Sequence, residues 1–201
     1  MPARRRTVRE IEIKLRVLNL PALLRDLRRL GAREHGRVLE RNTVYDTPDS
    51  DFRRRGRLLR LRIETPARLR TILGGRRRAV VTSKIPAIRS RSSRYKQNLE
   101  REAEVPSASS WAKVLRSLGL RVGFRYEKYR TRFRMPELHL DLDETPVGVF
   151  LELEGDPQAI DRAARALGYL HHDYVRGTYW DLYRAECERR GRIARNMLFP
   201  T

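Results

Sequence analysis

The sequence predicts an α+β fold in which antiparallel strands form a closed or nearly closed barrel, with amphipathic helices packed outside it. Two observations support this prediction. Several segments alternate charged and apolar residues with a period of two, as strands with one apolar face do. The segment order is strand, helix, several strands, helix, three strands and two helices, which lacks the regular strand–helix–strand units of a parallel sheet. If the sheet closes, its charged face becomes a polar lumen and its apolar face turns outward toward the helices.

Length and composition fit one folded domain with many charges. The chain has 201 residues, of which 40% are hydrophobic and 35% are charged, and its formal net charge is +20. That excess favours a polyanionic partner such as nucleic acid, polyphosphate, nucleotide or acidic membrane, although exposed arginines can also decorate a surface that has no ligand. We expect residues 1–190 to form a single domain and residues 191–201 to form a loose tail.

Cysteine content and hydropathy indicate the compartment. Cys187 is the only cysteine, so neither an intrachain disulfide nor a cysteine-based zinc site is expected. The basic residues 1–6 are not followed by an apolar stretch, unlike a signal peptide. No run approaches the roughly 18 apolar residues of a membrane span. We therefore expect a cytoplasmic protein that does not bind a membrane.

The first half of the chain is expected to contain one helix among five strands. Residues 7–17 alternate cleanly and predict the first strand. Asn19 is suited to cap a helix whose leucines recur at helical spacing until Gly31 ends it. Further strands are predicted at 37–46, 58–64, 79–85 and 99–105, separated by a turn at 45–49, a hairpin loop at 65–78 and a polar, basic and mobile stretch at 86–98.

The second half is expected to alternate helices with a group of three strands. Residues 107–118 carry a helical apolar stripe that Gly119 ends. Strands are predicted at 121–135, 138–144 and 147–154, followed by helices at 157–167 and 177–190.

The charges on these strands are grouped by sign at a spacing of two residues. Any one charged strand face could simply contact solvent. However, like charges at this spacing lie roughly 6–7 Å apart and repel, which a solvated face does not require. Carboxylate pairs can hold Mg²⁺ or Mn²⁺, and basic residues on facing strands can hold phosphate oxygens. The acidic pairs are Glu10/Glu12, Glu102/Glu104, Asp141/Asp143 and Glu152/Glu154, and the basic residues are Lys14, Arg60/Arg62, Lys84 and Lys128/Arg130.

Other residue types indicate less. The four histidines share no spacing typical of a metal site, so we interpret them as structural or exposed. Trp111 and Trp180 lie on helical stripes and are expected in the core rather than on a stacking platform. The sequence contains no GxxxxGK[ST] pattern, which excludes a P-loop enzyme.

Residues 10–14 form an ExExK run, and Tyr45-Asp46-Thr47-Pro48 form a turn motif. With further short motifs in order along the chain, they resemble the CYTH superfamily of triphosphate tunnel metalloenzymes, which has an ExExK signature and a YFDTP turn. Asn42 and Gly177 depart from the acidic and basic residues common at their positions, and the two arginine-rich loops are also unusual. The other matches are residues 59–62 (LRLR), 82–84 (TSK), 101–104 (REAE), 128–130 (KYR), Asp143 with 148–154 (GVFLELE), and 178–182 (TYWDL).

The resemblance implies a triphosphate substrate, Mg²⁺ or Mn²⁺ as cofactor, and a role for each charged pair. Glu102 and Glu104 would serve either a second metal or ion pairs with the basic lining. The implied metal ligands are Glu10, Glu12, Asp143, Glu152 and Glu154. The residues implied to bind the triphosphate are Lys14, Arg60, Arg62, Lys84, Lys128 and Arg130, and those implied in catalysis are Glu10, Glu12, Lys14 and Lys84.

Three functions remain open from the sequence. The family includes thiamine and inorganic triphosphatases, and hydrolysis of tripolyphosphate or of an organic or nucleoside triphosphate demands the least of the site. The alternative is a class IV adenylyl cyclase that converts ATP to cyclic AMP and pyrophosphate. The third is a non-catalytic binder of RNA or polyphosphate that uses the arginine clusters at 4–6, 53–57 and 76–78, although the acidic pairs would repel such a polyanion. A homodimer is compatible with each function.

Overall fold

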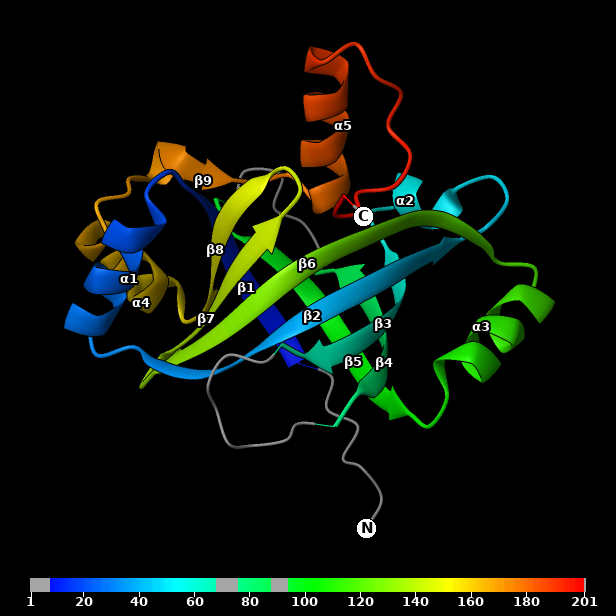
Figure 1. Ribbon diagram of the computed structural model, residues 1–201, viewed down its shortest axis with the longest axis horizontal. Helices are drawn as coiled ribbons and strands as arrows, with labels where there is room; N and C mark the ends of the chain where they lie inside the picture. The colour runs from blue at the N-terminus through cyan, green and yellow to red at the C-terminus, as the bar shows by residue number, and fades with distance from the viewer. Residues whose placement is uncertain (1–7, 68–75, 88–93, 201) are drawn as a thin grey trace.

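Eight antiparallel strands close into a barrel in the computed structural model, which describes residues 8–67, 76–87 and 94–200 (Figure 1). The strand order is β5-β4-β3-β2-β6-β7-β8-β1, and pairing between β1 and β5 closes the barrel. The short β9 pairs with β1 on the side away from β8, next to the stretch of β1 that pairs with β5. The predicted α+β fold, with helices packed outside a closed antiparallel barrel, is confirmed.

The elements follow the predicted order with a few additions. The strands are β1 (Val8–Val17), β2 (Arg33–Asp46), β3 (Leu58–Pro66), β4 (Arg78–Pro86), β5 (Lys96–Val105), β6 (Arg121–Met135), β7 (Leu138–Thr145), β8 (Gly148–Gly155) and β9 (Tyr174–Val175). The helices are α1 (Leu20–Arg29), α2 (Asp51–Arg54), α3 (Ala108–Ser117), α4 (Pro157–Ala166) and α5 (Tyr179–Arg189), with a 3-10 turn at His171–Asp173.

The helix starts are encoded locally. The side chain of Asn19 accepts a hydrogen bond from the Ala22 backbone N–H at 3.0 Å, so the predicted N-cap of α1 is confirmed. At the start of α5, the Thr178 hydroxyl and the Asp181 carboxylate each accept a bond from the other's backbone N–H, which forms a capping box. This box fixes the point at which α5 leaves the barrel wall.

Strand register keeps charged residues on one face of the closed sheet. Lys14 lies directly opposite Glu152 across β1 and β8, and Arg130 lies opposite Asp143 across β6 and β7. Because side chains alternate between the two faces of a strand, opposite residues share a face, and the in-phase charges of every strand meet inside the barrel.

The apolar face points outward, and helices cover it. Leu15, Leu27, Leu153 and Ile160 are fully buried where α1 and α4 cover β1 and β8. Burying one such side chain stabilises the fold by about 1.5–3 kcal/mol. A separate cluster under α3 contains the buried Leu115, and α5 stands over one end of the barrel (Figure 1).

Some boundaries differ from those predicted. β2 begins at Arg33 rather than 37, because its pairing with β6 extends past Gly36 through a register irregularity. β3 and β4 extend into the predicted hairpin loop, and β5 begins at Lys96 within the predicted mobile stretch. Residues 88–93 of that predicted mobile stretch lie outside the described ranges. α2, the 3-10 turn and β9 were not predicted, because two to four residues carry no readable period.

The prediction that residues 191–201 form a loose tail is wrong for the described residues of that segment. Met197 is fully buried, and its backbone exchanges hydrogen bonds of 2.9 Å with Arg125 and Glu127 on β6. The Phe199 ring lies 5.3 Å from the ring of Tyr129. The segment therefore docks along β6. None of the helices in the described ranges is long and apolar enough to cross a membrane.

Candidate functional site

The barrel lumen contains a cavity of about 380 Å³ lined mainly by charged side chains. Strands from every part of the wall contribute to it, because the register places their charged faces inward. Ten of the predicted site residues line it together: Glu10, Glu12, Lys14, Arg60, Arg62, Lys84, Lys128, Arg130, Glu152 and Glu154.

Asp143, also predicted to hold a metal, does not line the cavity. It is fully buried inside the barrel beneath the lining side chains, where its carboxylate accepts bonds from Lys128 Nζ at 2.6 Å and from Arg130 Nε at 2.7 Å. The Tyr179 hydroxyl donates a third bond at 2.7 Å. Burial and the adjacent Asp143 charge hold the pKa of Tyr179 well above its usual range, so this hydroxyl stays a donor. Asp143 therefore fixes the two cations in place.

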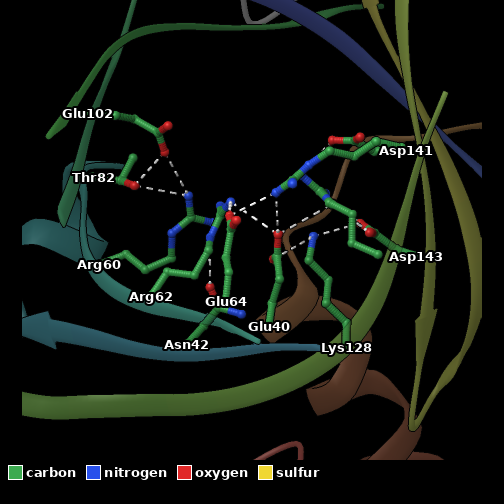
Figure 2. Close-up of polar contacts among 12 residues, drawn as sticks. Glu40, Asn42, Arg60, Arg62, Glu64, Thr82, Glu102, Lys128, Asp141 and Asp143 are labelled. Atoms are coloured by element: carbon green, nitrogen blue, oxygen red, sulfur yellow. Dashed lines mark hydrogen bonds and ion pairs between the residues drawn. The ribbon is translucent and has the colours of Figure 1, made fainter. Parts of the chain in front are cut away.

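The guanidinium groups of Arg60 and Arg62 are held by separate partners on the neighbouring strands (Figure 2). Arg60 donates to Thr82 Oγ1 at 3.1 Å and contacts Glu102 at 3.5 Å. Arg62 donates to Asn42 Oδ1 at 3.2 Å. For Glu102, the structure shows the ion pair that was one of its two predicted roles.

Glu40 is a buried carboxylate that the sequence analysis missed. It is fully buried beneath the cavity floor, 3.1 Å from Arg62, 3.6 Å from Lys128 and 3.7 Å from Arg130 (Figure 2). Burial alone would raise the pKa of Glu40, but these cations hold it well below its ordinary value. Glu40 therefore stays ionised and keeps three cavity-lining cations together.

Two other lysines of the lumen, Lys14 and Lys84, are paired with carboxylates of β8 and β1. Lys84 Nζ lies 2.6 Å from Glu10 and 2.9 Å from Glu100. Lys14 Nζ lies 3.2 Å from Glu152. Burial would raise the pKa of Glu10, but the adjacent Lys84 ammonium lowers it below its ordinary value. Anionic substrate groups must compete with these carboxylates for the lysines.

Negative charge is in excess where Glu154 meets β1. Among the described residues, Glu154 has no ion-pair or hydrogen-bond partner, and it lies opposite Glu12 in the strand register. Burial and repulsion from Glu10 and Glu12 raise the pKa of Glu154 to about 7. Burial and repulsion from Glu10 likewise raise the pKa of Glu100 to about 7, against the lowering effect of Lys84.

This group of carboxylates fits a divalent cation by its donor chemistry. Within the described ranges, no three acidic, histidine or cysteine side chains converge as a ready metal cluster. Glu154 nevertheless lies opposite Glu12 without a cationic partner among the described residues, and a divalent cation held by Glu10, Glu12 and Glu154 would relieve the repulsion that raises its pKa.

Several other lining residues were not identified from the sequence. They belong to strands that carry predicted residues, and the in-phase position was the available signal; Tyr179 lies within the TYWDL motif. His139, expected to be structural or exposed, is exposed and also borders the cavity. Asp141, named in the sequence only as part of an acidic pair, lines it as well. The residues not identified are Lys96, Asn98, Tyr126 and Tyr179.

Trp180 corrects another expectation. It was predicted to lie in the core, but it is only partly buried and lines the cavity at the end beneath α5. Its ring lies edge-on to Phe124 at 4.9 Å, and the Arg53 guanidinium sits 5.0 Å from its centroid. Trp111 is also partly exposed, with 37% of its surface accessible on α3.

Comparisons with known proteins agree with this architecture. The family model described as CYTH domain matches residues 8–179. A putative adenylate cyclase from Vibrio parahaemolyticus is 22% identical, with a TM-score of 0.71, over 88% of this chain and 98% of that chain. A Pyrococcus horikoshii protein is 23% identical, with a TM-score of 0.70, over 88% and 99% of the two chains.

A third solved structure carries a description of activity. It is a putative adenylyl cyclase from Hippeastrum, described as revealing a dominant triphosphatase activity. It is 19% identical, with a TM-score of 0.57, over 92% of this chain and 97% of that chain. No curated protein matches the sequence.

Proposed function

This chain belongs to the CYTH domain family, and we propose that it is a divalent-metal-dependent enzyme that hydrolyses tripolyphosphate or an organic or nucleoside triphosphate. Proteins of this family act on triphosphates. The residues of the lumen support hydrolysis as the reaction.

The observation that carries the proposal is the pairing of cations and carboxylates inside one cavity of the barrel. A triphosphate is a chain of anionic oxygens, and phosphoryl transfer depends mainly on positioning it and stabilising its charge. Buried guanidinium and ammonium groups do this more strongly than exposed ones, because little water screens them. The groups proposed to hold the phosphates are Lys14, Arg60, Arg62, Lys84, Lys128 and Arg130.

Glu10, Glu12, Glu152 and Glu154 are the residues we assign to the metal. When bound, Mg²⁺ or Mn²⁺ would neutralise phosphate charge and acidify a bound water. Asp143 was predicted as a fifth ligand. Its hydrogen bonds with Lys128 and Arg130 instead support a role in positioning these two cations.

The location of the basic groups favours hydrolysis over non-catalytic binding. A non-catalytic RNA binder would present its basic groups on the surface, whereas here the basic groups that converge lie inside the barrel beside carboxylates. The Hippeastrum protein's described triphosphatase activity favours hydrolysis, and the Vibrio protein's description as a putative cyclase keeps cyclic AMP formation as the second candidate.

A product assay tests the proposal. Purified protein is incubated with Mg²⁺ or Mn²⁺ and with tripolyphosphate, ATP or thiamine triphosphate, and the products are separated. We expect orthophosphate, and we expect its release to fall at least 100-fold in Glu10→Ala/Glu12→Ala. Glu137→Gln, which changes an exposed carboxylate outside the cavity, is the control. Formation of cyclic AMP and pyrophosphate would show the cyclase reaction instead of hydrolysis. If no product forms with any substrate, both proposed activities are wrong.

A further inference from the structure

At one end of the cavity, aromatic and cationic side chains lie beside two carboxylates, Asp46 and Asp181, which accept backbone hydrogen bonds at the starts of α2 and α5. Arg53, Arg57, Phe124 and Trp180 all contribute to this rim. α2 supplies Arg53, and the first turn of α5 supplies Trp180. We call these four residues the mouth. Because the same cavity includes Lys14 and Arg60, the mouth is continuous with the proposed triphosphate site.

The position of Arg53 is fixed by its backbone. The Asp46 carboxylate accepts hydrogen bonds from the backbone N–H groups of Phe52 at 2.9 Å and Arg53 at 3.1 Å. Asp46 is 7% exposed, so the charge that anchors α2 is itself buried. This anchor places the Arg53 guanidinium over the Trp180 ring, where cation–π attraction holds it.

The arginines of this segment divide into two groups. Arg54 forms an ion pair with Asp49 at 2.8 Å, and Arg55 forms one with Asp51 at 2.9 Å. Within the described ranges, neither Arg53 nor Arg57 has a carboxylate within 4.0 Å. The two arginines that border the cavity are thus the two whose guanidinium groups lack an anionic partner.

We propose that the mouth binds the base of a nucleoside triphosphate whose phosphates lie in the lumen. The base stacks on the exposed face of the Arg53 guanidinium, whose other face rests on Trp180. Planar bases stack well on arginine and aromatic groups, and such stacking tolerates any base. This inference rests on the proposed function, because it takes the lumen to be the triphosphate site.

The residues of the mouth are less suited to thiamine triphosphate or to inorganic tripolyphosphate and polyphosphate. Thiamine carries a permanent positive charge, which Arg53 and Arg57 would repel at close range. Inorganic tripolyphosphate has no ring to stack on the Arg53 guanidinium. A longer inorganic polyphosphate would contact the two arginines by charge alone. A neutral aromatic base stacks on Arg53, which rests on Trp180.

A binding experiment tests this without relying on catalysis. The chain has two tryptophans, so Trp111→Phe leaves Trp180 as the only fluorophore of its kind. We expect ATP to change Trp180 emission and tripolyphosphate to change it far less. In this background, Arg53→Gln is compared with Arg54→Gln, which removes the same charge from the neighbouring arginine. Dissociation constants for both ligands are measured by calorimetry with Mg²⁺.

We expect Arg53→Gln to weaken ATP binding about tenfold more than tripolyphosphate binding. That loss is in the range expected from removing the stacking of one base. Arg54→Gln should weaken both ligands equally and slightly. If Arg53→Gln weakens both ligands alike, the arginine binds phosphate and the base site is wrong, although the triphosphate proposal stands. If neither ligand binds the unsubstituted protein, the proposed function itself fails.

Discussion

At the scale of single residues, Asp143 and Glu40 show how a cationic site is kept in order before any substrate arrives. Both are fully buried, and both contact the cations that face the cavity. Taking charges out of water is costly, and that cost is offset here by close ion pairs and hydrogen bonds. The lysine and arginine side chains therefore reach the cavity with little freedom left to lose on binding phosphate.

Asp143→Asn separates a positioning role from a metal-ligand role. Removing one partner of a buried ion pair leaves the others uncompensated and costs about 3–5 kcal/mol of unfolding free energy. We expect that loss in urea unfolding, together with at least tenfold weaker tripolyphosphate binding and unchanged Mn²⁺ affinity. A fall in Mn²⁺ affinity comparable to that of Glu12→Gln would instead make Asp143 a ligand. Asp141→Asn, which also removes a partner of Arg130 at 2.6 Å, is the matched control.

Glu154 predicts an unusual pH dependence. Its pKa in the folded chain is raised to about 7 by burial and by Glu10 and Glu12, from an ordinary value of 4.5. Between these values the folded state binds more protons than the unfolded state, so the stability of the metal-free protein should fall as pH rises from 4.5 to 7. Urea unfolding at pH 5, 6, 7 and 8 measures this.

Glu154→Gln serves as the comparison for that titration. This substitution should remove part of the fall in unfolding free energy with rising pH. Glu100, whose pKa is also raised to about 7, should account for another part of that fall. Divalent metal should flatten the profile in the unsubstituted protein, because a cation stabilises the ionised carboxylates. A metal-free profile that rises between pH 5 and 7 and is unaffected by Glu154→Gln would contradict this account.

At the scale of elements, the helices stabilise the barrel from outside and leave its lumen free for polar groups. Leu27 on α1 and Leu153 on β8 are fully buried in the same cluster, whereas Leu18, just before α1, is 91% exposed. The cavity left by Leu27→Ala should lower the unfolding free energy by about 2–5 kcal/mol. Leu18→Ala should change it by no more than about 0.5 kcal/mol. Urea unfolding of the two variants checks this, and similar losses would contradict the assigned core.

The elements also show which features the sequence could predict. Alternation within each strand indicated which side chains share a face, because the period is local. The partner that closes the barrel was not readable, since β1 and β5 are joined by contacts far apart in the chain. Glu40 was missed because no second acidic residue lies in phase beside it on β2. The docking of Met197 depends on a distant strand, so its segment resembled a tail.

At the scale of the whole molecule, the charged residues behind the net charge of +20 lie in two environments. Inside the barrel, cations alternate with carboxylates and are shielded from solvent, whereas many arginines lie outside. Salt screens exposed charges strongly and buried ones weakly. Binding to a non-specific RNA should therefore fall steeply between 50 and 200 mM salt, by about 10³-fold or more.

Binding of tripolyphosphate with Mg²⁺ should fall far less over the same salt range, because its contacts are buried. Calorimetry or filter binding at each salt concentration compares the two ligands. Equal slopes for the two ligands would mean that tripolyphosphate binds to the outer arginines. Arg60→Gln should weaken tripolyphosphate binding at every salt concentration. It should leave the salt dependence of RNA binding unchanged.

The most direct test of the account is to locate the ligands in the protein. A crystal grown with tripolyphosphate and Mn²⁺ gives the phosphate density and, from anomalous scattering, the position of the metal. We expect the phosphates in the lumen on Arg60, Arg62 and Lys128, with Mn²⁺ on Glu10 and Glu12. Phosphate bound only on the outer surface, or Mn²⁺ held by carboxylates outside the lumen, would contradict the central claim that the barrel interior is a metal-dependent triphosphate site.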